Sequence, residues 1–396
     1  MRIGIDCRTI LSMETGELAG TAHYTSALVH HLLAIDKENT YVLFFDGRIK
    51  TAGHPSPGDG FRLPVMDWAN KNVEMVFLPV SRLPFVTTYW FLARALRRAK
   101  LDLFHSPAHP LPLGYNGKSV WTVHDLAIYN HPEWFPGGAR QWFSTRVTVP
   151  RSISRVTRLI AVSENTKRDM MRIFNVPKEK ISVIYEGAPK INQNDNTKFK
   201  NYFLFIGTIE PRKNLVRLID AFIQFRQNNL QLTLHHPSRI SGGTGQATYN
   251  LLLAGASGWK NDEVFLSIER ANLKLGKGSV QYLGYVSEEE KMALLKNATA
   301  FVWPSLYEGF GLPVLEAMSV GVPVITSNVS SIPEITGDAA VLVDPESVEE
   351  IADAMKRIVE DRALREQLKT RGVARAKEFT WEKMAKETLA VYQEVL

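Results

Sequence analysis

The sequence predicts an α/β protein made of two domains, each with a parallel sheet covered by helices. Three observations support this class. The chain has 396 residues, more than one ordinary hydrophobic core needs. Short apolar stretches typical of strands alternate with longer amphipathic stretches typical of helices. This alternation stops at a polar segment rich in Asn and Lys (188–201) and then starts again, so two parallel sheets with helices on both faces are expected.

The first half of the chain begins the alternation at its second residue. Ser163 is followed by an amphipathic stretch, so we expect its hydroxyl to cap a helix there. The predicted strands are 2–8, 40–45, 101–107, 119–126, 158–163 and 181–187, and the predicted helices are 22–35, 89–100 and 164–174. The boundaries expected for this domain are 1–188.

The second half repeats the pattern within 200–375. The predicted strands are 202–208, 250–257, 280–286, 300–305 and 323–328, and the predicted helices are 214–227, 262–276, 287–298 and 313–319. Residues 231–248 form a long polar connection with three glycines, which we interpret as a surface insertion. A final amphipathic helix occupies the remaining segment, 376–396.

Composition and charge narrow the function classes. The single cysteine, Cys7, excludes an internal disulfide, and neither a signal peptide nor an apolar run of about 20 residues is present, so a cytoplasmic protein is expected. Residues 1–190 hold 24 Lys and Arg against 16 Asp and Glu, whereas the remainder holds 23 against 25. The basic first half predicts an acidic partner, such as a phosphorylated acceptor or the anionic inner face of a membrane. No nucleic-acid-binding signature is present.

The stretch PSLYEGFGLPVLEAM (304–318) brackets a helix start with two acids. Two glycines precede Pro313, which fits a helix without strain only in its first turn. We therefore expect Glu308 in a loop, Pro313 as the first helical residue and Glu316 in the opening turn. The unpaired N–H groups at the helix start, near Gly311, suit an anionic ligand that also carries hydroxyls.

The stretch GTIEPRKN (207–214) supplies cations beside another helix start. Gly207 allows close backbone approach, while Arg212 and Lys213 can bind phosphate oxygens. A carboxylate about 4 Å from a phosphate costs on the order of 4 kcal/mol at an effective dielectric of 20, so Glu308 and Glu316 should face hydroxyls and leave phosphates to the cations. Together these groups predict a nucleotide-sugar site.

These motifs resemble those of the retaining glycosyltransferases of family 4, which have the GT-B architecture of two facing Rossmann-like domains and an interdomain cleft. EGFGLPVLE is similar to that family's motif of two glutamates separated by seven residues. GTIEPRKN, LGYVSEEEK and GVPVITSNVSSIPEITGDAAVLVDP follow the family's order, and the mannosyltransferase-like subgroup is the most similar. The resemblance implies that the last helix packs back onto the first domain.

The resemblance also implies roles for individual residues. Glu316 would hold the ribose hydroxyls, Glu308 would contact the sugar, and Arg212 with Lys213 would neutralise the diphosphate. Main-chain atoms near Val286 would bind the base, and His124, at a strand end of the first domain, would touch the transferred sugar unless it is a structural loop histidine. The backbone expected to bind phosphate and sugar oxygens is that of Gly309, Phe310, Gly311 and Leu312.

One position departs from the family pattern, and two motifs are absent. The family's Gly-x-Gly loop keeps Gly20 here, but Ala22 stands where the second glycine is common. A Cβ there narrows the approach of donor phosphate and acceptor. The sequence lacks Asp-x-Asp, so we expect neither a metal nor another cofactor. It also lacks the Gly-x-Gly-x-x-Gly and Walker motifs, which disfavours a dehydrogenase or an NTPase.

The predicted function is transfer of a hexose to a saccharide or lipid-linked acceptor in polysaccharide or glycoconjugate biosynthesis. The favoured hexose is mannose, with GDP-mannose as the donor. The alternatives are UDP-glucose or UDP-GlcNAc as donor, a nucleotide-sugar epimerase or hydrolase of the same fold, and a non-catalytic nucleotide-sugar binder. The aromatic and basic segment 87–100 is expected as a core-facing helix, with contact to an anionic membrane as the alternative.

Overall fold

The computed structural model describes residues 1–10, 20–47, 72–79, 90–188, 197–235 and 248–396, with side chains from 229 to 235 excepted. The chain divides into two compact units. Unit 1 comprises Met1–Asn130, Gly137–Gly187 and Thr380–Leu396, and unit 2 comprises His131–Pro136 and Ala188–Phe379. The predicted α/β class with two parallel sheets is confirmed.

Unit 1 contains a seven-stranded sheet in the order β3-β2-β1-β4-β5-β6-β7, and every neighbouring pair is parallel. Its strand order reverses between β1 and β4, the first strand of each half. The strands are β1 (Arg2–Asp6), β2 (Thr40–Asp46), β3 (Val73–Leu78), β4 (Leu103–Ser106), β5 (Ser119–Val123), β6 (Arg158–Ala161) and β7 (Ile181–Val183).

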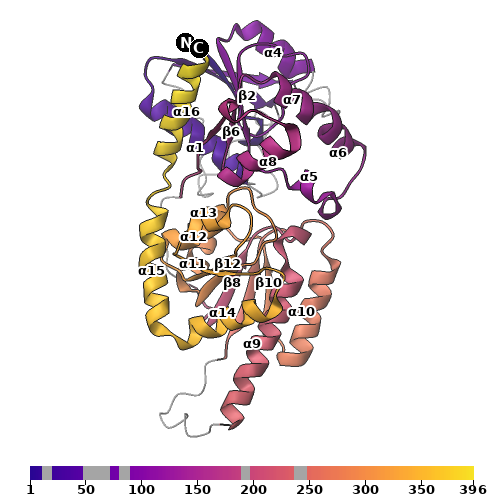
Figure 1. Cartoon of the computed structure of the whole chain (residues 1–396), viewed down its shortest axis with the longest axis vertical. Coiled ribbons are helices and arrows are strands. Elements are labelled where there is room, and N and C mark those ends of the chain that lie inside the picture. Colours follow the sequence, from indigo (N-terminus) through magenta and orange to yellow (C-terminus); the bar gives the residue numbers. More distant parts are fainter. Residues whose placement is uncertain (11–19, 48–71, 80–89, 189–196, 236–247) are drawn as a thin grey trace. The chain divides into compact units, whose positions relative to one another are not determined.

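Two apolar cores cover the faces of this sheet. Successive strand residues point to opposite faces, so Leu43 belongs to one core while Phe44 belongs to the other. The first core includes α1 (Gly20–Ile35) and α16 (Trp381–Val395), which pack against each other (Figure 1). The second includes residues of α4 (Leu92–Ala99), α7 (Val149–Arg155) and α8 (Glu164–Phe174).

The remaining helical pieces of the first half are short. They are α5 (Ala127–Asn130), a 3₁₀ turn at Pro132–Trp134, α6 (Ala139–Phe143), a π-helical turn at Ser144–Thr148 that leads into α7, and a 3₁₀ turn at Lys178–Lys180. The Pro132–Trp134 turn belongs to unit 2, where the indole N–H of Trp259 donates to the Trp134 carbonyl at 2.7 Å.

Unit 2 contains a six-stranded sheet in the order β10-β9-β8-β11-β12-β13, again parallel throughout. All residues of β8 and β11 are buried, as is typical of central strands covered on both faces. The strands are β8 (Tyr202–Ile206), β9 (Asn250–Ala254), β10 (Val280–Gly284), β11 (Ala300–Trp303), β12 (Val324–Ser327) and β13 (Val341–Val343).

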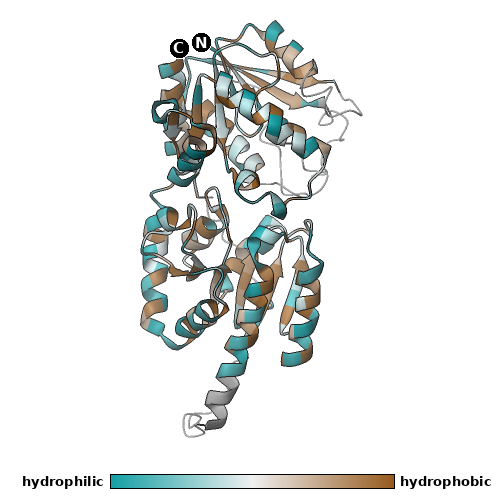
Figure 2. Cartoon of the chain, turned by 45° about the vertical axis from the view of Figure 1, so that its right-hand side comes forward, coloured by the Kyte–Doolittle hydropathy of each residue, from teal (hydrophilic) through white to brown (hydrophobic). Residues whose placement is uncertain are grey.

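Helices flank this sheet, and Figure 2 shows brown, apolar strands beside helices that carry teal, polar residues along part of their surface. The helices of unit 2 are α9 (Leu215–His235), α10 (Asp262–Leu275), α11 (Glu288–Asn297), α12 (Leu312–Ser319), α13 (Ile332–Thr336), α14 (Val348–Glu360) and α15 (Arg362–Ala376). A 3₁₀ turn at Pro211–Lys213 precedes α9. Within the described parts of the chain, no helix is long and apolar enough to cross a membrane.

Several sequence expectations are corrected in detail. Helix α12 begins at Leu312 instead of Pro313, so Glu316 lies in its second turn and not in its opening turn. Helix α9 continues to His235, so the polar connection expected at 231–248 begins as helix, and 236–247 lie outside the described residues. The predicted cap is confirmed, because Oγ of Ser163 accepts from the Thr166 N–H at 3.0 Å.

Candidate functional site

The candidate site lies where the strand order of the unit 2 sheet reverses. The order runs outward from β8 through β9 to β10 in one direction, and from β11 through β12 to β13 in the other. In open parallel sheets, the loops that leave the carboxyl ends of the two strands at such a point diverge and leave room for a ligand. The loop after β8 contains 207–214 and the loop after β11 contains 304–311, so the two motifs singled out in the sequence meet here.

Short-range contacts fix these two loops to each other. The carbonyl oxygen of Arg212 accepts from the Leu306 N–H at 2.8 Å and from Oγ of Ser305 at 3.0 Å. Asn214, in the left-handed conformation with φ 62°, donates through its amide to the carbonyls of Pro304 and Pro345. These hydrogen bonds, at Arg212 itself and at Asn214 directly after Lys213, set the positions of the basic residues.

An ion cluster forms between the loops. The Lys213 ammonium donates to Oε1 of Glu308 at 2.6 Å, and the Arg212 guanidinium donates to Oε2 at 3.1 Å. Nε of Arg212 lies 2.6 Å from a carboxylate oxygen of Glu210. Lys213, Glu210 and Glu308 are buried, and the side chain of Arg212 is 20% exposed. Two cations and two anions make this cluster formally neutral.

Two stacked aromatic rings, Trp303 and Phe205, pack against the cluster. The Lys213 nitrogen lies 4.4 Å from the centroid of the Trp303 ring, which stacks on Phe205 at 4.7 Å. The indole N–H of Trp303 donates to Oε1 of Glu308 at 3.0 Å. A Cβ at Gly207 would lie 2.6 Å from the Trp303 ring, so this glycine makes room for the indole. Cation–π attraction and a charged hydrogen bond thus hold both Lys213 and Glu308 in place.

These contacts change the acidities of the buried groups. Burial alone would raise the pKa of Glu308, but the charges of Lys213 and Arg212 and the hydrogen bond from Lys213 lower it to about 2. Burial and the neighbouring Arg212 charge lower the pKa of Lys213, while Glu308 and Glu210 oppose that shift. Glu308 is therefore ionised across the physiological range, and its charge opposes the lowering of the Lys213 pKa.

The geometry differs from the expectation that the acids would face hydroxyls while the cations faced phosphates. In this structure both oxygens of Glu308 are engaged by the two cations themselves, because a buried carboxylate without a partner is strongly destabilised. An ammonium has three N–H groups, and Glu308 takes one from Lys213, so the same nitrogen can also donate to a ligand. A ligand bound at that nitrogen would be connected to Glu308 through Lys213.

The loop that precedes α12 has a conformation that requires glycine. Gly311 has φ 110°, and a Cβ there would lie 2.8 Å from Cδ1 of Ile332. Ser331 donates to the carbonyls of Glu308 and Phe310, both at 3.0 Å, and Ser330 accepts from the Glu308 N–H at 3.0 Å. Both serines lie in the long C-terminal motif, but no local pattern in that motif assigns them a role.

The other predicted residues lie in this loop, at the start of α12, or after β10. Phe310 is buried and packs edge-on against Phe379, with the ring centroids 5.9 Å apart, and Leu312, half-buried, is the first residue of α12. Gly309 is buried between Glu308 and Phe310. Val286, half-buried, lies between β10 and α11, also at the carboxyl end of its strand.

Glu316 lies in a second ion pair. Its Oε1 is 3.1 Å from the ammonium of Lys291, which also contacts Glu288 at 2.8 Å. Burial lowers the pKa of Lys291, but the charges of Glu316 and Glu288 raise it above its ordinary value. Lys291 is the last residue of the motif LGYVSEEEK, so the motif contained a residue that the sequence interpretation left without a role.

His124 lies in unit 1, directly after β5, whereas the cluster described above belongs to unit 2. Its Nδ1 is 3.0 Å from a carboxylate oxygen of Glu186 and its Nε2 is 2.8 Å from the Pro107 carbonyl. Both partners accept, so the geometry fits a doubly protonated ring. Burial lowers the pKa of His124, but the hydrogen bond and charge of Glu186 raise it above its ordinary value. Both ring nitrogens are engaged within unit 1.

Glu186 is a partner that the sequence analysis missed, although an acid at the carboxyl end of a predicted strand was a usable signal. Gly20 is the first residue of α1 and is exposed, while Ala22 is buried within that helix. The rest of the expected loop, 11–19, lies outside the described residues. Among the residues that the structure describes, no group of three His, Cys, Asp or Glu side chains is arranged to hold a metal ion.

Comparison with known proteins identifies the family of the chain. Residues 188–375 match the family model described as "Glycosyl transferases group 1", and residues 20–189 match "Glycosyltransferase Family 4". The chain is a glycosyltransferase and belongs to family 4, in the mannosyltransferase-like group that the sequence motifs indicated.

Its relatives include O-antigen chain mannosyltransferase B of Escherichia coli, which is 34% identical over 76% of this chain and 76% of that protein. O-antigen chain mannosyltransferase RfbU of Salmonella typhimurium is 30% identical over 69% of this chain and 70% of that protein.

Among solved structures, sucrose-phosphate synthase from Thermosynechococcus elongatus is similar with a TM-score of 0.70 at 20% identity, covering 100% of this chain and 99% of that one. The glycosyltransferase WaaG, described as involved in lipopolysaccharide biosynthesis, has a TM-score of 0.68 at 14% identity, covering 98% of this chain and 99% of that one. At these identities the likeness shows the GT-B fold alone.

Proposed function

We propose that this glycosyltransferase moves mannose from GDP-mannose to a saccharide or lipid-linked acceptor with retention of the anomeric configuration, in the assembly of a polysaccharide such as an O-antigen chain. The likeness to two O-antigen mannosyltransferases, each at 30% identity or more, supports the sugar and the pathway class. The observation that carries the proposal is the buried cluster of Arg212, Lys213 and Glu308 at the carboxyl ends of β8 and β11.

The cluster suits departure of a nucleoside diphosphate. As the bond between the anomeric carbon and the diphosphate oxygen breaks, negative charge grows on that oxygen. Lys213 and Arg212 are held beside this position by Glu308, Glu210 and Trp303, so little reorganisation is needed when the charge develops. Preorganised charge of this kind is often the largest catalytic contribution.

The remaining chemistry follows from the retaining class. The acceptor oxygen bonds to the anomeric carbon on the face that the diphosphate leaves, and its proton passes to the departing diphosphate oxygen. No protein nucleophile takes part. Glu316, beside Lys291, would accept hydrogen bonds from the ribose hydroxyls, and the backbone from Gly309 to Leu312 would bind phosphate and sugar oxygens. His124 and Gly20 would lie on the acceptor side.

The decisive experiment has a binding stage and a transfer stage. A thermal-shift panel with GDP-mannose, UDP-glucose, UDP-GlcNAc and an ADP-sugar should single out GDP-mannose, because a ligand bound only by the folded state stabilises it by mass action. The preferred donor is then incubated with mannose-terminated oligosaccharides, and the anomeric configuration of the product is read by NMR.

Each outcome has a defined meaning. An α-linked mannoside formed from GDP-α-mannose supports the proposal, and a β-linked product refutes retention. Preference for a UDP-sugar refutes the assigned donor. An epimerised sugar or rapid release of free mannose without acceptor favours the epimerase or hydrolase alternative. Donor binding without turnover across the whole acceptor panel favours a non-catalytic binder.

A further inference from the structure

The ring of His124 lies between two oxygen atoms of unit 1 that accept hydrogen bonds. Its Nδ1 is 3.0 Å from a carboxylate oxygen of Glu186, and its Nε2 is 2.8 Å from the carbonyl oxygen of Pro107. A neutral imidazole has a proton on one nitrogen and a lone pair on the other, so it would turn a lone pair toward one of these oxygens. Both contacts are favourable only when each of them holds a proton.

His105, on the neighbouring strand β4, has surroundings of a different kind. Its Nδ1 is 2.6 Å from the hydroxyl of Tyr392, and its Nε2 is 2.9 Å from the hydroxyl of Thr122. Hydroxyl groups donate as well as accept, so a neutral ring satisfies both contacts. Burial and the nearby charge of His124 lower the pKa of His105 to about 3. The two buried histidines therefore differ because His124 has a carboxylate beside it.

That carboxylate belongs to Glu186, which is buried. Among the side chains that the structure describes, that of His124 is the one that pairs with it. A buried carboxylate without a partner is strongly destabilised, so each group holds the other in its charged form. Burial lowers the pKa of His124, and Glu186 and Asp125 together raise it above its ordinary value. The other titratable side chains that contact the ring or act on its charge are those of Tyr24, His105 and His109.

Packing fixes the ring and the carboxylate in place. The ring of Tyr24, from α1, is perpendicular to that of His124, with the centroids 4.8 Å apart. The hydroxyl of Thr166, in the first turn of α8, donates to the His124 carbonyl at 3.2 Å. A Cβ at Gly187 would lie 2.3 Å from the main-chain nitrogen of Trp381, so the segment that carries Glu186 packs directly against the start of α16. The position of the charge is thus set by three helices.

We propose that Glu186 is a positioning residue of the transfer reaction: it holds His124 as a cation whose N–H groups point to Glu186 and Pro107, so that His124 acts through its charge and not as a base. Neither ring nitrogen then has a lone pair that could take the proton of the acceptor. The acceptor O–H bond breaks as its oxygen bonds to the anomeric carbon, and the proton goes to the diphosphate oxygen that leaves that carbon. This role rests on the transfer step proposed above, and the charge would favour a ligand oxygen that becomes more negative.

The first measurement is a pH titration of the His124 ring by NMR of the full chain with labelled histidines, without donor or acceptor. The signals are assigned by their loss in His124→Gln. The wild-type ring should titrate above the ordinary value of 6.5. In Glu186→Gln, the amide can donate to Nδ1, so a neutral ring fits the same space and the midpoint should fall by about 1–3 pH units. A wild-type ring that is neutral at its ordinary value, or an unmoved midpoint in the variant, overturns the proposal.

The second measurement is the turnover number at saturating substrates between about pH 5 and 9, with the nucleotide-sugar that gives the largest thermal shift. The wild-type rate should fall as the pH rises through the midpoint found by NMR, and this fall should move to lower pH in Glu186→Gln by the same interval. A rate that rises through the midpoint would show that His124 is a base, and a fall that does not move would show that Glu186 has no influence on the reaction. Either result overturns the proposal.

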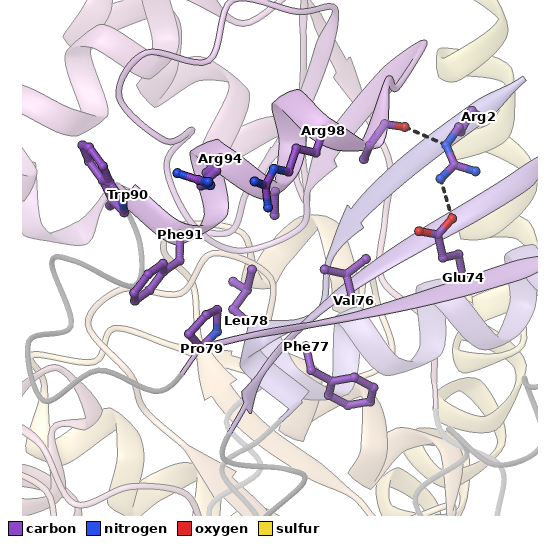
Figure 3. A pocket seen from close by; sticks show the side chains of 12 residues that line it. Arg2, Glu74, Val76, Phe77, Leu78, Pro79, Trp90, Phe91, Arg94 and Arg98 are labelled. Carbon is purple, nitrogen blue, oxygen red and sulfur yellow. Dashed lines mark hydrogen bonds and ion pairs between the residues drawn. The ribbon is translucent and has the colours of Figure 1, made fainter.

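Glu74→Gln is the matched control, because it removes the same charge from an ion pair elsewhere in the sheet. Glu74 pairs with Arg2 on the outermost strand β3, beside a pocket of about 440 Å³ between β3 and α4 (Figure 3). Its titration midpoint for His124 and its pH profile should equal those of the wild type, and an equal shift in this control overturns the proposal. All variants are checked for an unchanged circular dichroism spectrum. Absence of transfer from every donor would contradict the proposed function, while the NMR titration would still decide whether Glu186 holds the charge of His124.

Discussion

At the scale of single residues, the contacts of Glu308 hold the candidate site together. The carboxylate accepts from an ammonium, a guanidinium and an indole N–H, all within 3.1 Å. A carboxylate bonded in this way holds its partners in fixed positions but cannot bind a sugar hydroxyl without sharing its lone pairs. Glu308 therefore supports the two cations, and a ligand hydroxyl that bound it would share the same carboxylate oxygens.

Replacement of Lys213 tests charge stabilisation directly. Lys213→Ala should lower the turnover number by on the order of 10²-fold, because a fixed donor at the departing oxygen is lost. Lys277→Ala, which removes an exposed lysine before β10 at the opposite end of the sheet, serves as the control. Rates are measured at saturating donor, and wild-type turnover in the Lys213 variant would remove this residue from the mechanism.

The low pKa of Glu308, about 2, predicts how stability depends on acid. A depressed folded-state pKa contributes stability above the unfolded value of about 4.3, and this contribution disappears as the pH falls toward about 2. The loss over that window is on the order of 3 kcal/mol. Glu308→Gln should be less stable near neutral pH and lose less on acidification. Denaturant unfolding of both proteins at several acidic pH values measures this, and parallel pH profiles would contradict the assignment.

Variants around Lys291 test whether Glu316 binds the ribose of the donor or only pairs with Lys291. Glu316→Ala should weaken GDP binding about 10- to 100-fold, since a charged hydrogen bond to a hydroxyl contributes roughly 1.5–3 kcal/mol. Glu288→Ala removes the more exposed partner of Lys291 and leaves the pair with Glu316 intact, so its GDP affinity should stay close to that of the wild type. Calorimetry compares the two variants, and equal affinities would refute the ribose contact.

At the scale of elements, the turn into α12 shows why the motif contains glycine. The loop reaches the helix through a residue with φ 110°, and Ile332 of α13 fills the space where a side chain would begin. Ser331 holds the preceding carbonyls from the same direction. The helix start is thus fixed by the neighbouring segment as well as by its own sequence.

Gly311→Ala should destabilise unit 2 by about 1–3 kcal/mol through backbone strain and by a further amount through contact with Ile332. The double variant Gly311→Ala/Ile332→Val lacks the Cδ1 atom of Ile332. It should regain only the stability that the single variant loses through contact with Ile332. Unfolding midpoints and GDP affinity are measured for both. Full recovery in the double variant would mean that φ imposes no strain, and no loss in the single variant would refute the argument.

Some elements with strong local signals were predicted with the correct bounds, while other elements were missed. The bounds of α8 match the prediction, because a cap and a clear amphipathic pattern mark them. Strands β3 and β13 were missed, as were α14 and α15, whose bounds lie in the C-terminal part of unit 2. Strand β13 has only three residues, too few to show a period, and pairing with β12 defines it.

At the scale of the whole molecule, both units follow one plan. Each sheet is parallel and reverses its order beside its first strand, between β1 and β4 in one unit and between β8 and β11 in the other. His124 and Glu186 follow strands of the first sheet, as Lys213 and Glu308 follow strands of the second. The candidate residues of both units therefore lie at carboxyl ends of strands, where this class of fold binds its ligands.

Removal of metal ions tests the charge balance of the complete enzyme. Because Arg212 and Lys213 would neutralise the departing diphosphate, exhaustive treatment with EDTA should leave the transfer rate within about twofold of the untreated enzyme. The rate is measured after dialysis, with and without added Mg²⁺ or Mn²⁺. Loss of activity that either ion restores would contradict the expectation of a metal-independent enzyme.

The sequence alone determined the α/β class, the strand and helix pattern on both sides of a polar segment, and the motifs that identify the family. These features are local, because periodicity, caps and short motifs depend on residues a few positions apart. Only the tertiary structure decided the partners of the charged groups. Lys213 and Glu308 are 95 positions apart, and Glu316 and Lys291 are 25 apart. Lys213 and Glu308 meet because β8 pairs with β11, and Glu316 of α12 meets Lys291 of α11. No local sequence pattern encodes contacts between residues so far apart.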